Sequence, residues 1–147
     1  MAGEARMGGM PEGVPGRMQD VGRVVLGLGM GERLAVLGAV GVLAVSLVFG
    51  LITRDYGVGQ VAFLLAVVLL FVMYRGRVQQ AADGVDYTTL VIALGGMLGL
   101  IGLRELVLDL RFEIFDAGTA TILAAMLFWA STIAAGAGAL QVAMARR

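Results

Sequence analysis

The side chains of this chain that could do chemistry are concentrated between residues 102 and 116, where charges interrupt a long apolar stretch. They are Arg104, Glu105, Asp109, Arg111 and Glu113. Carboxylates and guanidinium groups near a membrane surface could form an outer vestibule that holds an ion or a polar substrate. The alternatives are a structural cluster, in which Arg104 pairs with Asp109 or a neighbouring carboxylate, and a docking site for a partner protein. The pattern leaves these three interpretations open.

The backbone that carries this charged cluster could be helical or extended. In a helix, Glu105, Asp109 and Glu113 recur every four residues and form one acidic ridge. In a strand, apolar and charged residues alternate from 108 to 114. We expect the helix, which continues past the membrane interface before a tight return of the chain.

Four apolar stretches must position this cluster, and they dominate the sequence. They cover about 34–52, 56–74, 87–108 and 117–145. Three of them hold no charged residue, and the third holds only Arg104 and Glu105. A helix of about 20 residues spans the roughly 30 Å of bilayer hydrocarbon. We therefore expect an all-α integral membrane protein, in which residues 33–147 form four transmembrane helices arranged as two antiparallel hairpins.

Small residues mark a candidate helix-packing face on the third and fourth stretches. It consists of Gly95, Gly99, Gly102, Ser131, Ala135 and Ala139. Helices associate in lipid through close backbone approach, which small residues permit, and Gly95 and Gly99 form a G-x-x-x-G pattern. This face could pack within the four-helix bundle or against a second copy or another protein. Trp129, near the middle of the fourth stretch, is expected to pack against helices or to find a hydrogen-bond acceptor.

Composition excludes several kinds of chemistry. The 147 residues are 59% hydrophobic and include no Cys and no His, and the formal net charge is zero. Thiol catalysis, cysteine-bound metals and the common histidine base or ligand are therefore excluded. No acidic residue lies in the interior of a stretch, so we predict no catalytic, cofactor-binding or metal site. The balanced charge gives no reason to expect nucleic acid as a partner.

The arginines predict the orientation in the membrane. On one side of the four stretches lie Arg6, Arg17, Arg23, Arg33, Arg75, Arg77, Arg146 and Arg147, and on the other Arg54, Arg104 and Arg111. The positive-inside rule then places both termini in the cytoplasm. We expect a multipass protein of a prokaryotic plasma membrane, with a viral or other envelope membrane as the alternative. Asp55, Asp86 and Asp116 each precede a stretch and are expected to cap it.

The N-terminal segment, residues 1–32, lacks a sustained period and reads as flexible and cytoplasmic, with an apolar interfacial stretch at 21–30. Met30 begins a sequence that resembles a chain start, so residues 1–29 are expected to be dispensable for insertion. The glycines at 27, 29 and 31 resemble a phosphate loop only superficially. Glu32 stands where the dinucleotide pattern needs a small residue, so nucleotide binding is not expected.

These features favour a non-catalytic multipass membrane protein. The expected role is an accessory or scaffold subunit that packs with itself, as a homo-oligomer, or with another membrane protein in the lipid bilayer. The alternative is a component of a small oligomeric channel, a holin-like pore or a transporter. A pore would need an amphipathic span to line water, and the first and second stretches are apolar on every face, which argues against it.

Overall fold

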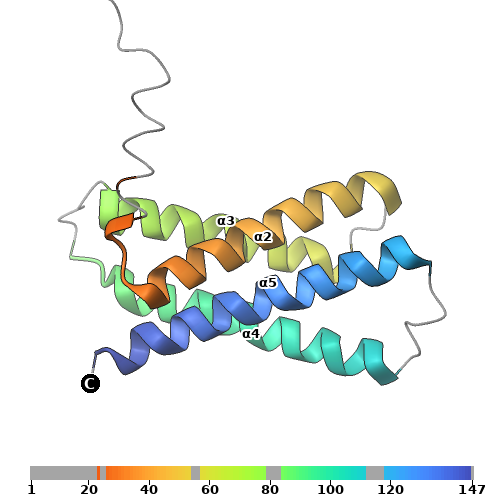
Figure 1. Cartoon of the computed structure of the whole chain (residues 1–147). Coiled ribbons are helices and arrows are strands. Elements are labelled where there is room, and N and C mark those ends of the chain that lie inside the picture. Colours follow the sequence, from red (N-terminus) through yellow and green to blue (C-terminus); the bar gives the residue numbers. More distant parts are fainter. Residues whose placement is uncertain (1–22, 24–25, 54–56, 79–83, 112–117, 147) are drawn as a thin grey trace, which may run out of the picture.

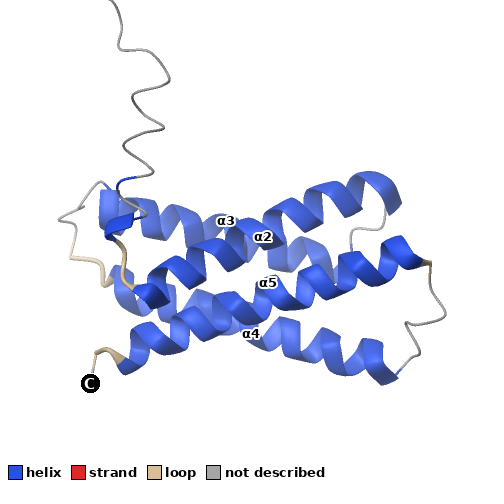
Figure 2. Cartoon of the chain, viewed as in Figure 1, coloured by secondary structure: helices blue, strands red, loops and turns tan. Residues whose placement is uncertain are grey.

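The computed structural model describes residues 23, 26–53, 57–78, 84–111 and 118–146 (Figure 1). Most of these residues are helical, and none of them forms a strand (Figure 2). The helices are α2 (Met30–Thr53), α3 (Gly57–Met73), its π-helical continuation η1 (Tyr74–Val78), α4 (Tyr87–Arg111) and α5 (Thr119–Met144). Four of these segments are long and apolar enough to cross a membrane. The expected all-helical chain with four such helices is therefore confirmed.

Consecutive helices run in opposite directions and form a bundle (Figure 1). The most extensive contacts join α5 to α2 and to α4, whereas α3 contacts α2 and α4 less. The order around the bundle is therefore α2, α3, α4, α5. We call one end of the bundle the Arg77 end, defined by Met30, Arg77, Tyr87 and Met144. We call the opposite end the Asp109 end, defined by Thr53, Gly57, Asp109 and Thr119.

The start of α2 lies inside the segment that the sequence assigned to the N-terminal region. The helix begins at Met30, earlier than the expected residue 34. The Gly29 N–H donates to Oε2 of Glu32 at 3.1 Å, and this carboxylate in the first turn satisfies an otherwise free donor. Leu28 is buried and joins the hydrophobic core. Leu28 and Gly29 are thus part of the packed structure, while residues 1–22 lie outside the described residues.

The charged region after Leu103 is helical, as expected. Helix α4 continues without interruption to Arg111, so the extended alternative is excluded up to that residue. The cap expected at Asp86 is present, because the Thr89 N–H donates to its Oδ1 at 3.1 Å. At α5 the N-cap position is Gly118, which has no side-chain cap. Asp55, Glu113 and Asp116 lie outside the described residues.

The core is concentrated toward the Arg77 end. Among the described side chains, the buried positions of α2 end at Val42 and those of α4 end at Gly102, while those of α5 begin at Trp129. Composition explains this distribution. Helix α5 has only glycine and alanine from 134 to 139, which lets its neighbours approach, but it has Leu, Met, Phe and Trp between 123 and 129. The two halves of α5 therefore pack differently.

The outer surface of the bundle is apolar on all four helices. Exposed large side chains include Leu37, Leu47, Leu64, Phe71, Met97, Leu100, Val107, Leu127 and Leu140. Only between 28% and 33% of the residues in each candidate span are buried inside the chain. A soluble protein rarely exposes so large a continuous apolar surface, because its exterior must be solvated by water.

Candidate functional site

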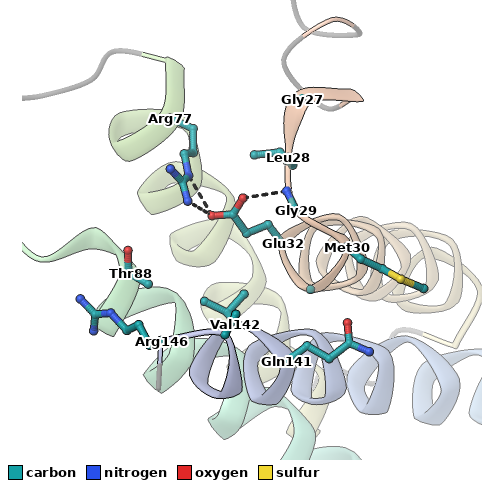
Figure 3. A pocket seen from close by; sticks show the side chains of 12 residues that line it. Gly27, Leu28, Gly29, Met30, Glu32, Arg77, Thr88, Gln141, Val142 and Arg146 are labelled. Carbon is teal, nitrogen blue, oxygen red and sulfur yellow. Dashed lines mark hydrogen bonds and ion pairs between the residues drawn. The ribbon is translucent and has the colours of Figure 1, made fainter.

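Glu32 is the one charged residue that the described part of the chain buries, with 8% of its surface exposed. Its Oε1 accepts a hydrogen bond from Nε of Arg77 at 2.8 Å and a second one from Nη2 of the same guanidinium. Its Oε2 accepts the Gly29 N–H (Figure 3). Both carboxylate oxygens therefore have partners, which offsets the cost of removing the charge from water.

Arg77 reaches Glu32 from η1, the π-helical turn that ends the second span. Such turns hold one more residue than an α-helical turn and re-aim the side chains that follow. Here the turn also brings Gly76 against the first residue of α4, because a Cβ on Gly76 would lie 2.7 Å from Cβ of Tyr87. The close approach of η1 to α4 therefore requires glycine at position 76.

A second ion pair closes the same end of the bundle. Nη2 of Arg146, beyond the end of α5, lies 2.8 Å from Oδ2 of Asp86, the residue before α4. Nη1 of Arg146 donates to the Thr89 hydroxyl at 2.8 Å. Hydrogen bonds from the Thr89 hydroxyl, from Arg146 and from the Thr89 N–H hold the pKa of Asp86 well below its usual range.

A pocket of about 700 Å³ lies between these two ion pairs. It is lined by the start of α2 with the residues before it, by η1, by the first turn of α4 and by the end of α5 (Figure 3). The polar side chains on its wall are Glu32, Arg77, Thr88, Gln141 and Arg146. Four segments distant in the sequence thus contribute to one polar cavity at the Arg77 end.

The Asp109 end has a simpler arrangement of polar groups. Arg104 bonds to its sequence neighbour Glu105, which is a local contact on one helix. Asp109 instead accepts a hydrogen bond from the indole Nε1 of Trp129 at 3.0 Å. Trp129 is buried, so it both packs against helices and has an acceptor, as expected for an indole in this position.

The charged cluster singled out from the sequence is therefore only partly brought together. Arg104 pairs with Glu105, one of the neighbouring carboxylates considered, and Asp109 bonds to α5. Arg111 is the last residue of α4, and its side chain lies outside the described part, as does all of Glu113. The Ser46 hydroxyl, in the half of α2 that leads to this end, is buried and has no partner in the described structure.

The small residues of α4 lie inside the bundle against α5. A Cβ on Gly95 would lie 2.7 Å from Cβ of Ala139, and one on Gly99 would lie 2.8 Å from Cα of Gly136. Gly102 lies against Thr132 in the same way. By contrast, a Cβ on Gly96 would meet nothing within 4 Å. The G-x-x-x-G face of α4 is thus covered by α5 of the same chain.

The other small residues of α5 belong to a second contact, with α2. Ser131 lies against Gly41, and both Ser131 and Ala135 lie against Gly38. Further along, Gly138 lies against the backbone of Gly31 and Ala35. The six residues proposed as one packing face therefore divide between two interfaces. Helix α5 uses one side for α4 and another for α2.

Sequence reasoning missed the polar cavity at the Arg77 end. It treated Glu32, Arg77 and Arg146 as loop or terminal charges, and it assigned Asp86 only a capping role. One signal was present: Glu32 stands two residues before an uninterrupted apolar run, where a carboxylate in the first helical turn has a favourable electrostatic position. The partner of Glu32 is 45 residues away and cannot be inferred from spacing.

Comparisons with known proteins add no relative: no protein-family model, no curated protein and no solved structure matches this chain. Within the described residues, no group of three Asp, Glu, His or Cys side chains is placed to hold a metal ion. The geometry of the chain itself therefore has to carry any functional conclusion.

Proposed function

We propose that this chain is a non-catalytic multipass membrane protein that acts as an accessory or scaffold subunit. Its four helices cross the bilayer as two antiparallel hairpins, with the Arg77 end and both termini in the cytoplasm. The observation that supports this proposal is the apolar exterior. Large apolar side chains are exposed on all four helices, and at most about a third of the residues in each span is buried inside the chain. Lipid and partner helices are the surroundings that suit such a surface.

The interior supports a packing role over a transport role for one copy. The centre of the bundle is filled by apolar side chains, among them Val42, Leu69, Val72 and Leu98. Transporters usually place ionisable groups near the bilayer midplane. The buried charge described here, Glu32, lies instead at one end of the bundle and is neutralised by Arg77.

The alternative function, a component of an oligomeric channel, pore or transporter, would require several copies around a shared lumen. The glycine-lined faces of α4 and α5 are already occupied within the chain. A homo-oligomer would therefore associate through the outer apolar surface. A partner subunit would use the same surface, so the two functions differ in what that surface contacts.

Native mass spectrometry of the complex, extracted from its own membrane in mild detergent, tests the proposal. A partner protein of fixed stoichiometry supports an accessory subunit. A discrete homo-oligomer with no other protein fits either a scaffold that packs with itself or the alternative pore. Conductance of that oligomer in a bilayer would then contradict the proposal.

Topology has its own test, which the absence of native cysteine simplifies. A cysteine at exposed Thr119 should react with an impermeant maleimide added outside, whereas one at Val85 should react only after the membrane is opened. The reverse pattern would overturn the proposed orientation.

A further inference from the structure

The pocket at the Arg77 end has both charged and apolar walls. Arg77, Thr88 and Arg146 lie on the left in Figure 3, and Met30 and Gln141 lie on the right. Apolar lining comes from Leu28, Met30, Val142 and Ala145. A volume of about 700 Å³ is within the range of small-molecule sites. The ligand that fits this lining has an anionic group and an apolar neighbour.

The two pocket arginines are held in place and still accessible. Arg77 is fixed by Glu32 and Arg146 by Asp86, yet their side chains are 52% and 47% exposed. A guanidinium has five N–H donors, and each of these salt bridges leaves some of them unused. Because the carboxylates already restrict the rotamers, less conformational entropy is lost when a ligand binds.

The charge balance at this end favours an anion. Among the described residues that belong to it, the arginines are Arg33, Arg75, Arg77 and Arg146, and the carboxylates are Glu32 and Asp86. Glu32 is enclosed and uses both oxygens, and Asp86 accepts bonds from Thr89 and Arg146. Neither carboxylate therefore presents an unpaired negative charge to a ligand. Of these residues, Arg77, Arg146 and Glu32 line the pocket, so its wall carries an excess of one positive charge.

We propose that this pocket binds a phosphate group, carried either by an anionic phospholipid headgroup or by a soluble phosphate compound. The planar guanidinium fork matches phosphate oxygens, and basic pockets between helices on the cytoplasmic side of a membrane bind anionic headgroups. The apolar wall at Met30 and Val142 suits the acyl chains of a lipid. The lipid source rests on the proposed membrane setting, whereas the phosphate chemistry rests on the pocket alone.

The experiment measures binding to the purified full chain in an uncharged detergent. One arm titrates phosphatidylglycerol, with phosphatidylcholine of identical acyl chains as the reference, by native mass spectrometry. The other arm titrates inorganic phosphate by calorimetry. One variant is Arg146→Gln. The other is the double variant Glu32→Gln with Arg77→Gln. The double variant removes the Arg77 guanidinium, keeps the net charge unchanged and leaves no buried carboxylate without a partner. Arg104→Gln, at the opposite end, is the matched control.

We expect phosphatidylglycerol to bind more tightly than phosphatidylcholine, and each pocket variant to weaken that binding about five-fold, while Arg104→Gln has no effect. Binding of inorganic phosphate with the same sensitivity to the variants supports the site and identifies a soluble source. Equal binding by the wild type and both pocket variants overturns the proposal, as does an equal loss in Arg104→Gln. Circular dichroism of each variant verifies that it is folded.

Failure of the proposed membrane function can be distinguished from failure of the pocket proposal. A chain that does not insert into vesicles contradicts the proposed function, yet the phosphate arm still tests the pocket. A chain that inserts normally but binds neither phosphatidylglycerol nor phosphate refutes the pocket and leaves the proposed function standing.

Discussion

The two ends of this bundle hold their charged groups in different ways. At the Arg77 end, ion pairs join segments 45 and 60 residues apart and link all four helices around a pocket. At the Asp109 end, Arg104 bonds to the next residue, and the one described hydrogen bond between side chains of different helices joins Trp129 to Asp109. The packing follows the same division, because the small residues of α5 and the core lie toward the Arg77 end.

This difference shows how a helical bundle can be closely packed at one end and less closely packed at the other. Glycine and alanine bring backbones together at the Arg77 end, and once the helix ends are close, long-range ion pairs become geometrically possible. Bulky residues separate the helices of the other half, so its polar groups find local partners or, like Ser46, none in the described structure. The strength of interhelical polar contacts thus depends on the packing beneath them.

The largest effect should come from placing the same bulky side chain in each half of α5. Ala135 is fully buried between α2 and α4, whereas Ala125 is partly exposed in the other half. Ala135→Leu should destabilise the bundle by about 3 kcal/mol or more because overpacking displaces backbone on both sides. Ala125→Leu should change stability by less than about 1 kcal/mol. Thermal unfolding in detergent measures both, and equal losses would remove the distinction between the halves.

A smaller change on α4 sharpens the role of its glycines. Gly99→Ala should cost about 1–3 kcal/mol, since the new Cβ would lie 2.8 Å from the backbone of Gly136. Gly96→Ala adds the same atom in open space and should be neutral or stabilising by up to about 1 kcal/mol. If the two variants unfold at the same temperature, the close α4–α5 contact is not what holds these helices together.

Breaking the ion pair at Glu32 should have a moderate effect. Arg77→Gln leaves a largely enclosed carboxylate without its main partner, and we expect a loss of about 1–2 kcal/mol, below the cost for a fully buried pair because Arg77 is half exposed. Adding Glu32→Gln should recover part of that loss. A double-mutant cycle by chemical denaturation gives the coupling, and a coupling near zero would show that the pair contributes no stability.

The bond between Trp129 and Asp109 should matter less. Trp129→Phe keeps an aromatic ring but removes the donor to Asp109, and we expect a cost of about 1 kcal/mol. Asp109→Asn retains an acceptor and should cost less. The same unfolding assay compares them, and a Trp129→Phe cost above that of Arg77→Gln would reverse the ranking of the two ends.

The smallest effect concerns pH. Because the pKa of Asp86 is lowered in the folded chain, its stabilising contribution is present above the ordinary value of 3.8 and is lost as pH falls through the lowered pKa. Thr89→Val and Arg146→Gln should each raise the pKa of Asp86, since the Thr89 hydroxyl and the Arg146 guanidinium both hydrogen-bond to the carboxylate. Carboxyl chemical shifts measured against pH test both shifts. An unchanged pKa in both variants would contradict the assigned hydrogen bonds.

The sequence was sufficient to predict the four long apolar helices, because uninterrupted apolar runs of that length seldom form any other structure. It also predicted the helical course past Leu103, the cap at Asp86 and an acceptor for Trp129, which depend on residues close in sequence or on one buried donor. Division of the small residues between two interfaces was not predictable, because the side of α5 that faces α2 rather than α4 depends on the crossing of three helices.

The polar cavity escaped prediction for a related reason. Glu32 and Arg77 are 45 residues apart, so no helical periodicity relates them. Arg77 lies in the π-helical turn at 74–78, and from there its side chain reaches Glu32 in the first turn of α2. Nothing in the sequence Tyr-Arg-Gly-Arg-Val distinguishes such a turn from an ordinary helix end. Gly76, required by its contact with Tyr87, reads from the sequence as a simple helix breaker.

The central position of α5 has a consequence for biosynthesis. Helix α5 is the last of the four to leave the ribosome, yet it provides the closest-packed surface for both α2 and α4. Until α5 is synthesised, the glycines of α2 and α4 that pack against it, such as Gly38 and Gly99, are left uncovered. Quality-control proteases would therefore meet an incomplete bundle whenever synthesis stops before residue 118.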